Sequence, residues 1–149
     1  MPLSDDAVRH HVYTVTAERG RPPRVADVAS ALGMAPGDVA AAFGRLRERR
    51  LLLLAGNGEI VMAPPFSAVP TPFQVTSGGT TYFANCVWDA YGIAAALGRD
   101  SDIEASCACC GEPMALAVRG GAPLLADGET AVAHFAIPAR HWWDDLPHT

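Results

Sequence analysis

The sequence has no lysine, and all 11 of its basic residues are arginine. It also lacks any apolar run close to the roughly 18 residues that span a bilayer, which excludes a transmembrane helix. Its first ten residues, MPLSDDAVRH, are acidic and have no apolar centre, so they do not resemble a secretory signal. We therefore expect a soluble, cytoplasmic protein with no membrane partner.

Excess positive charge is missing too, since the formal net charge is −5. Residues 1–63 carry eight Arg against seven Asp and Glu, whereas residues 64–149 carry three Arg against nine. Because nucleic acids attract basic surfaces, the second half is a poor candidate for binding them, while the first half stays open. Half of the residues are hydrophobic, which is enough to form a buried core.

Cysteine is absent from the first 85 residues, and the four that occur are Cys86, Cys107, Cys109 and Cys110. Without a secretory signal, such a group indicates metal, redox or catalytic chemistry more than a disulfide framework. The last three are too close in sequence to supply three well-placed tetrahedral ligands, which disfavours a closed zinc site. A disulfide between the adjacent Cys109 and Cys110 would be strained.

Helical periodicity dominates the first part of the chain. It predicts one helix over 4–20 with a Ser N-cap, a second over 22–33 and a third over 35–52. A hairpin about Gly56-Asn57-Gly58 follows. Three helices and a hairpin are typical of a winged helix-turn-helix, which we predict as a first domain over 1–63.

The second part of the chain changes character. Residues 64–80 are rich in proline and predict an extended linker. A helix over 84–97, ended by Gly98, opens a core domain over 81–149. The expected fold class is therefore α+β, with the three-helix lobe followed by a small, mostly antiparallel sheet and one packed helix. The β-like runs are DIEASCA, PMALAV, PLLADG and TAVAHFAI, separated by turns at CCGEP, VRGGAP and ADGET.

The start of the core-domain helix combines a thiol with an acid. Asn85 is a good N-cap, which would place Cys86 in the first turn, where the positive helix end favours a thiolate. Asp89 shares its face, and Trp88 and Tyr91 could wall it and raise its pKa so that it holds a proton. Such a pair suits cleavage of a bond to a soft metal. The same spacing also fits a cysteine that packs as a small hydrophobe.

The stretch CVWDAYGIAAALGRDSDIEASCACCGEPMALAV resembles the core of the organomercurial (alkylmercury) lyase family. The shared features are a Cys with Asp three residues on, an apolar helix ending in LGR, and a second Cys 21 residues after the first. A G-x-P turn and another apolar strand follow in the same order. The passage GEIVMAPPFSAVPTPFQV also resembles the way into the core of that family.

The resemblance implies that Cys86 binds mercury, that Asp89 gives a proton to the departing carbon and that Cys107 is structural. It implies an organomercurial substrate, no organic cofactor, and a small thiol or carrier protein that accepts the metal. The family's second catalytic cysteine would follow a segment like HFAIPARHWWDD, but no cysteine follows Cys110. We therefore expect a shortened core with altered or lost activity. Cys109 or Cys110 is the candidate replacement, so Cys86, Cys109 and Cys110 are the predicted ligands of mercury or another soft metal.

Two other functions stay open. Arg45, Arg47, Arg49 and Arg50 lie at the end of the third predicted helix and could contact phosphate in a metal- or thiol-responsive DNA-binding regulator. A solvated helix end explains the same arginines, and the helix has few side chains that read bases, so nucleic acid is not the expected partner. The other alternative is a soft-metal binder without catalysis.

Overall fold

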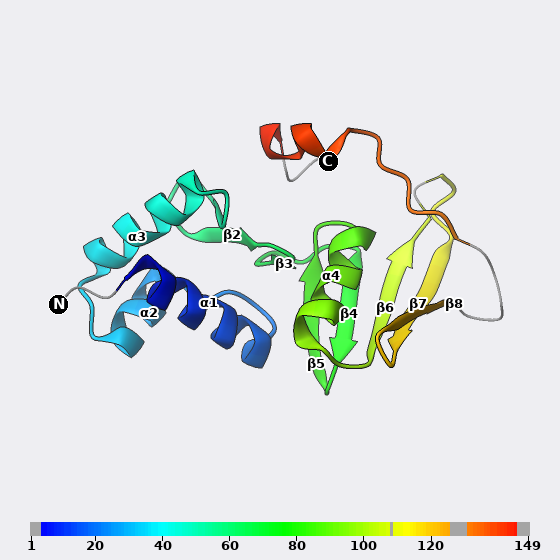
Figure 1. The fold of residues 1–149 in the computed structure, drawn as a ribbon, viewed down its shortest axis with the longest axis horizontal. Coiled ribbons are helices and arrows are strands. Elements are labelled where there is room, and N and C mark those ends of the chain that lie inside the picture. The colour runs from blue at the N-terminus through cyan, green and yellow to red at the C-terminus, as the bar shows by residue number, and fades with distance from the viewer. Residues whose placement is uncertain (1–3, 108, 126–130, 146–149) are drawn as a thin grey trace.

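The computed structural model describes residues 4–107, 109–125 and 131–145 (Figure 1). Three helices occupy one end of the molecule, and a sheet with a fourth helix occupies the other. The elements are α1 (Asp5–Arg19), α2 (Val25–Leu32), α3 (Pro36–Glu48), β1 (Leu53–Leu54), β2 (Ile60–Ala63), β3 (Phe66–Ser67), β4 (Phe73–Ser77), β5 (Thr80–Ala84), α4 (Val87–Leu97), β6 (Ser101–Ser106), β7 (Pro113–Arg119), β8 (Ala122–Leu125) and the 3-10 helix η2 (Ala139–Asp144).

The first three predicted helices and the hairpin are confirmed. The hydroxyl of Ser4 accepts the backbone N–H of Ala7 at 3.2 Å, which caps α1 as expected. Gly20 ends α1 with φ of 84°, and Gly33 ends α2 with φ of 64°, a region that favours glycine. β1 and β2 then pair antiparallel. Whether this lobe is a winged helix stays a prediction.

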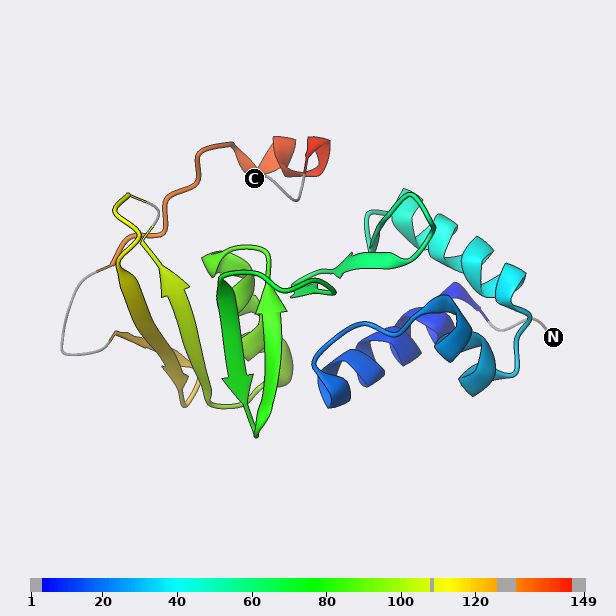
Figure 2. The ribbon, with the colours of Figure 1, turned by 180° about the vertical axis from the view of Figure 1, so that it is seen from behind.

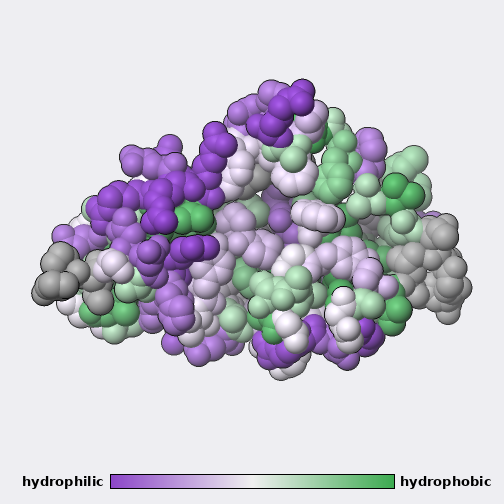
Figure 3. Space-filling model, viewed as in Figure 1, coloured by the Kyte–Doolittle hydropathy of each residue, from purple (hydrophilic) through white to green (hydrophobic). Residues whose placement is uncertain are grey.

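A first hydrophobic core lies inside the helical end. Two ion pairs join the surfaces of its helices: Arg45 binds Asp5 at 2.7 Å, and Arg49 approaches Asp6 at 3.5 Å. Hydrophilic side chains cover this end, whereas hydrophobic ones gather toward the sheet (Figure 3). The buried residues of the first core are Val8, Val12, Val28, Ala29, Val39, Ala42, Phe43, Leu46, Leu52, Ile60 and Ala63.

The strands form one antiparallel sheet in the order β1-β2-β3-β5-β4-β6-β7-β8. α4 covers one face of it, and the view from behind shows β4 and β5 in front of that helix (Figure 2). Burial alternates along β6, with Ile103 and Ala105 buried and Glu104 exposed, as expected for a sheet covered on one face. This arrangement confirms the α+β class.

A second hydrophobic core lies between α4 and the sheet. Tyr82 is fully buried in it, and its hydroxyl donates to the carbonyl of Ala17 at 2.5 Å. Gly20 lies close by, because a Cβ there would come within 2.3 Å of the carbonyl oxygen of Thr81. The end of α1 is therefore packed directly against β5. The buried residues of this core are Phe66, Val75, Tyr82, Ala84, Ala90, Ile93, Ala94, Ile103, Ala105, Leu116 and Val118.

Two predicted segments need correction. The expected linker over 64–80 contains β3 and β4, which pair with β2, β5 and β6, because its Phe, Val and Ser positions alternate toward the second core. The run TAVAHFAI is not a strand over residues 131–137, where the chain is irregular and exposed. The turn ADGET, residues 126–130, lies outside the described residues. The division into domains stays a prediction.

Within the described part of the chain, no helix combines the length and apolar character needed to cross a membrane.

Candidate functional site

α4 starts at Val87, three residues after the predicted start at 84, and its N-cap is one residue later than predicted. Cys86, not Asn85, is the N-cap, with an extended backbone at φ −148° and ψ 177°. The pairing of β5 with β3 and β4 reaches Ala84 and holds the chain extended up to this point. The hydroxyl of Thr71 also donates to the carbonyl of Ala84. Cys86 therefore sits at the end of the helix rather than in its first turn.

The structure brings Cys86 and Asp89 together. The sulfur of Cys86 donates to Oδ2 of Asp89 at 3.6 Å, a separation that suits a hydrogen bond with a thiol donor. Both side chains are half-buried. An N-cap and the third residue of its helix lie on the same side of the first turn, so the local geometry follows directly from the spacing.

The protonation of this pair differs in part from the prediction. Burial raises the pKa of the Cys86 thiol, the negative charge of Asp89 adds to that effect, and the backbone amides of Asp89 and Trp88 oppose it. The shift of the Cys86 pKa is therefore opposite in direction to the expected one, because desolvation outweighs the helix end. Burial also raises the pKa of Asp89, as predicted, while the hydrogen bond from Cys86 acts the other way. The thiol keeps its proton and points it at a carboxyl that is ready to accept it.

α4 lies close to the turn that joins β2 to β3. Gly92, in the middle of α4, faces Pro65, and a Cβ at Gly92 would come within 3.1 Å of the Pro65 Cβ. This is tighter than ordinary packing, so a larger residue at Gly92 would require Pro65 or the helix to shift by a few tenths of an ångström. The contact fixes the position of α4 on the sheet, and with it the position of Cys86 and Asp89.

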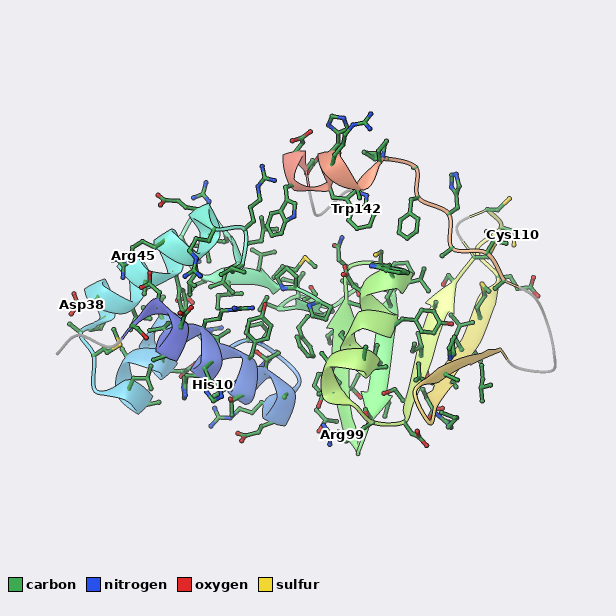
Figure 4. All side chains as sticks on the ribbon, viewed as in Figure 1. His10, Asp38, Arg45, Arg99, Cys110 and Trp142 are labelled. Atoms are coloured by element: carbon green, nitrogen blue, oxygen red, sulfur yellow. The ribbon has the colours of Figure 1, made fainter. Side chains whose placement is uncertain are left out.

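An apolar depression of about 420 Å³ lies between α4 and residues 135–142, and neither Cys86 nor Asp89 is among its lining residues. Trp88 forms one wall and is 55% exposed. Its ring contacts Phe135 at 5.7 Å between centroids, and Phe135 contacts Trp142 at 5.2 Å. Figure 4 shows Trp142 on η2, above the end of α4 that carries Cys86. The predicted second wall, Tyr91, instead packs against the second core.

Sequence reasoning missed the contribution of residues 131–145 to this depression. The segment reads as one more strand, but its aromatic residues reach back over α4. The signal in the sequence was the spacing of Phe135 and Trp142, seven residues apart with a proline between them, which disfavours a regular strand.

The remaining cysteines lie in the turn between β6 and β7. Figure 4 shows Cys110 in this turn, beyond the end of β6. Backbone amides and the thiol of Cys110 lower the pKa of Cys107, which is half-buried, whereas Cys109 and Cys110 are both exposed. Positions 107 and 110 have the spacing C-x-x-C, which sequence reasoning did not single out. The predicted metal set of Cys86, Cys109 and Cys110 stays a prediction.

A family model described as alkylmercury lyase matches residues 66–148. This covers more than half of the chain. The chain belongs to the alkylmercury lyase family. The match to the alkylmercury lyase model begins at β3 and contains Cys86, Asp89, the β6–β7 turn and η2, so it includes every element of the candidate site.

A solved structure, the mercury-bound form of MerB2, is also similar to this chain. The TM-score is 0.65 and the sequence identity is 26%. The similarity covers 83% of this chain, so the helical end takes part in it, and 60% of the MerB2 chain. Comparison with curated proteins finds no match. The likeness to MerB2 therefore includes part of the helical end, which the family model does not cover.

Proposed function

We propose that this chain is an organomercurial lyase-like protein, with Cys86 as the mercury-binding thiol and Asp89 as the proton donor. The observation that carries the proposal is the 3.6 Å contact between the Cys86 sulfur and the Asp89 carboxylate. Membership of the alkylmercury lyase family and the likeness to mercury-bound MerB2 support the choice of substrate. The substrate is a small organomercurial that is carried by a thiol.

The proton of Cys86 has a defined path in this reaction. When the Cys86 sulfur displaces the carrier thiolate from R–Hg–SR′, the thiol proton passes to the Asp89 carboxylate. This gives Cys86–S–Hg–R, a neutral Asp89 carboxyl and R′S⁻. The raised pKa values of both groups support this order, because the proton stays on sulfur until mercury replaces it and the acid that receives it is easily protonated.

The second step breaks the carbon–mercury bond. The Asp89 carboxyl protonates the carbon, the hydrocarbon R–H leaves, and R′S⁻ takes the vacated position on mercury. Exchange with a further thiol R′SH then restores the Cys86 thiol and releases Hg(SR′)₂. No electrons are transferred and no organic cofactor is needed. A small thiol or a thiol-bearing carrier protein is the partner that accepts the ion.

The apolar depression beside Trp88 supports the same substrate class. Its walls are aromatic and aliphatic, so it suits the organic group of such a substrate. We also propose a cytoplasmic location, because the reaction needs reduced Cys86 and an excess of small thiols.

The DNA-binding alternative receives less support. Arg45 binds Asp5 through Nε and Nη2, and Arg49 approaches Asp6. Arg45 of α3 and Arg49 at its C-cap are therefore partly neutralised by α1, which lowers their attraction for phosphate. A soft-metal binder without catalysis stays as the alternative that an activity assay must separate.

The test is protonolysis of phenylmercury in excess small thiol, with benzene measured by gas chromatography. We expect the wild-type protein to release benzene above the background of thiol alone and Cys86→Ser to lose that release. Asp38→Asn, an exposed change on α3, is the control and should behave as wild type. No benzene from the wild type, or equal rates for wild type and Cys86→Ser, would contradict the proposal. Mercury binding without benzene release would identify the non-catalytic binder.

A further inference from the structure

A side-chain hydroxyl binds the strand end that precedes the Cys86 N-cap. The hydroxyl of Thr71 donates to the carbonyl of Ala84, the last residue of β5, and a second acceptor, the carbonyl of Phe73, lies 3.2 Å away. The same hydroxyl oxygen accepts the N–H of Phe73 at 3.2 Å. Thr71, which is half-buried, therefore ties the start of β4 to the end of β5.

The prolines beside Thr71 explain why a side chain makes this bond. Pro70 and Pro72 flank Thr71, and proline has no N–H, so the segment before β4 lacks two of the backbone donors that pair neighbouring strands. The hydroxyl of Thr71 supplies a donor in their place. A proline also restricts the residue before it to an extended conformation, which limits the positions that the Thr71 side chain can take.

Ala84 is two residues from Cys86 in the sequence, so a bond that holds Ala84 also limits the N-cap. Ala84 is fully buried and is paired with Phe66 of β3 and Phe73 of β4. Beyond it the chain enters α4, where the carbonyl of Cys86 accepts the N–H of Ala90 at 3.0 Å. Cysteine is not among the residues that commonly cap helices with their side chains, so the direction in which α4 leaves the sheet depends on how the strand end is held.

We propose that Thr71 is a positioning residue for the candidate site, and that its hydroxyl keeps the Cys86 sulfur within hydrogen-bond distance of Asp89. This role rests on the proposed function of that pair. The sulfur and the carboxylate oxygen are 3.6 Å apart, so a displacement of the N-cap by about 1 Å would break their hydrogen bond. A reaction in which a proton moves between these two groups is sensitive to such a displacement.

The experiment compares Thr71→Val, which keeps the shape of the side chain without the hydroxyl, with Thr71→Ser, which keeps the hydroxyl. In the phenylmercury assay, Thr71→Val should lower kcat about tenfold with little change in KM, because the Cys86 sulfur still binds mercury but is misplaced for proton transfer. Thr71→Ser should keep a kcat near that of the wild type.

Alkylation by iodoacetamide gives a second readout that needs no turnover. The rate at Cys86, divided by the rate at Cys107 in the same protein, should rise several-fold in Thr71→Val, because Cys86 loses its contact with Asp89 and becomes more accessible. The ratio should stay at the wild-type value in Thr71→Ser. Failure of the proposed function is therefore distinguishable: no benzene release from any protein, together with these ratios, would contradict the lyase activity and support the positioning by Thr71.

Thr16→Val is the matched control. Thr16 is fully buried in α1, and its hydroxyl donates to the carbonyl of Val12 at 2.6 Å, so this change removes an equivalent bond from the helical end. Both readouts should stay as in the wild type, and urea unfolding measures the stability that each protein loses.

An unchanged alkylation ratio in Thr71→Val would overturn the proposal. An equal rise in Thr16→Val would overturn it too, since the cause would then be a general loss of stability. The same rise in Thr71→Ser would exclude the hydroxyl as the group responsible. If Thr71→Val does not fold, Thr71→Ala removes the same hydroxyl without adding a methyl group and is judged by the same outcomes.

Discussion

Cys86 at the start of α4 and Cys107 at the end of β6 carry the same thiol in opposite environments. Burial and a neighbouring carboxylate raise the pKa of Cys86, whereas amides and a second thiol lower that of Cys107. Backbone amides act on both sulfurs in the same direction. The difference shows that amides at the end of a helix or in a turn activate a cysteine only where desolvation does not outweigh them.

The contrast bears on the chemistry proposed for Cys86. A thiol that keeps its proton beside an acid can deliver that proton to carbon, which is what the proposed bond cleavage needs. Cys107, whose pKa is lowered by backbone amides and the Cys110 thiol, loses its proton more readily. The predictions below test whether this contrast is real, beginning with the largest expected effect.

Removal of the acid should separate cleavage from binding. Asp89→Asn keeps the shape of the side chain but cannot accept and return the proton of Cys86, so benzene release should fall about 10²- to 10⁴-fold. Mercury should still bind at Cys86. The rate comes from gas chromatography and the bound ion from mass spectrometry, with Asp38→Asn as control. A rate within twofold of the wild type would remove Asp89 from the mechanism.

Alkylation rates should show the contrast between the thiols directly. Near pH 7.5, Cys107 should react with iodoacetamide at least about tenfold faster than Cys86, because its pKa is lowered while that of Cys86 is raised, which gives Cys107 the larger thiolate fraction. Tandem mass spectrometry of the digested protein distinguishes Cys107 from the neighbouring cysteines. Equal rates would mean that burial does not control Cys86.

Asp89→Asn should also reduce the difference in alkylation rate between Cys107 and Cys86. The charge and the hydrogen bond of Asp89 both raise the pKa of Cys86, so their loss should increase the alkylation rate of Cys86 several-fold. The rate at Cys107 should stay the same and serves as the internal reference. A slower Cys86 in this protein would show that Asp89 activates the thiol instead of holding its proton.

The smallest effect concerns stability. Burial raises the pKa of Asp89 in the folded protein above its usual 3.8, so the folded state holds this proton more tightly than the unfolded state does. The stabilisation by this proton is complete below pH 3.8 and is lost as the pH rises through the raised pKa. Asp89→Asn should therefore have a higher urea midpoint than the wild type at pH 7, and that advantage should disappear below about pH 4. If the higher urea midpoint of Asp89→Asn did not depend on pH, its cause would not be the raised pKa of Asp89.

Local signals accounted for much of the fold. Helices begin and end where the capping residues predicted, because capping depends on a few neighbouring residues. Ser4 begins α1, and three helices end at Gly20, Gly33 and Gly98. The predictions failed where a strand pairs with strands that are distant in the sequence. The proline-rich segment over 64–80 joins the sheet because β2, β5 and β6 offer it hydrogen bonds and a core to cover.

The candidate site likewise has one part that the sequence predicts and one part that it does not. Its reacting pair could be predicted, since an N-cap and the third residue of a helix meet whatever the rest of the chain does. Its aromatic wall could not, because Phe135 comes from a part of the chain 47 residues beyond Trp88. No local sequence pattern shows that these two side chains meet in the folded chain.

The sequence by itself determined which groups are present and which of them are neighbours along the chain: a thiol and an acid one helical turn apart, and a C-x-x-C pair followed by glycine. The tertiary structure decided their protonation. Desolvation depends on what packs around a group, and only the folded chain buries Cys86 and Asp89 while it leaves the β6–β7 turn open to water.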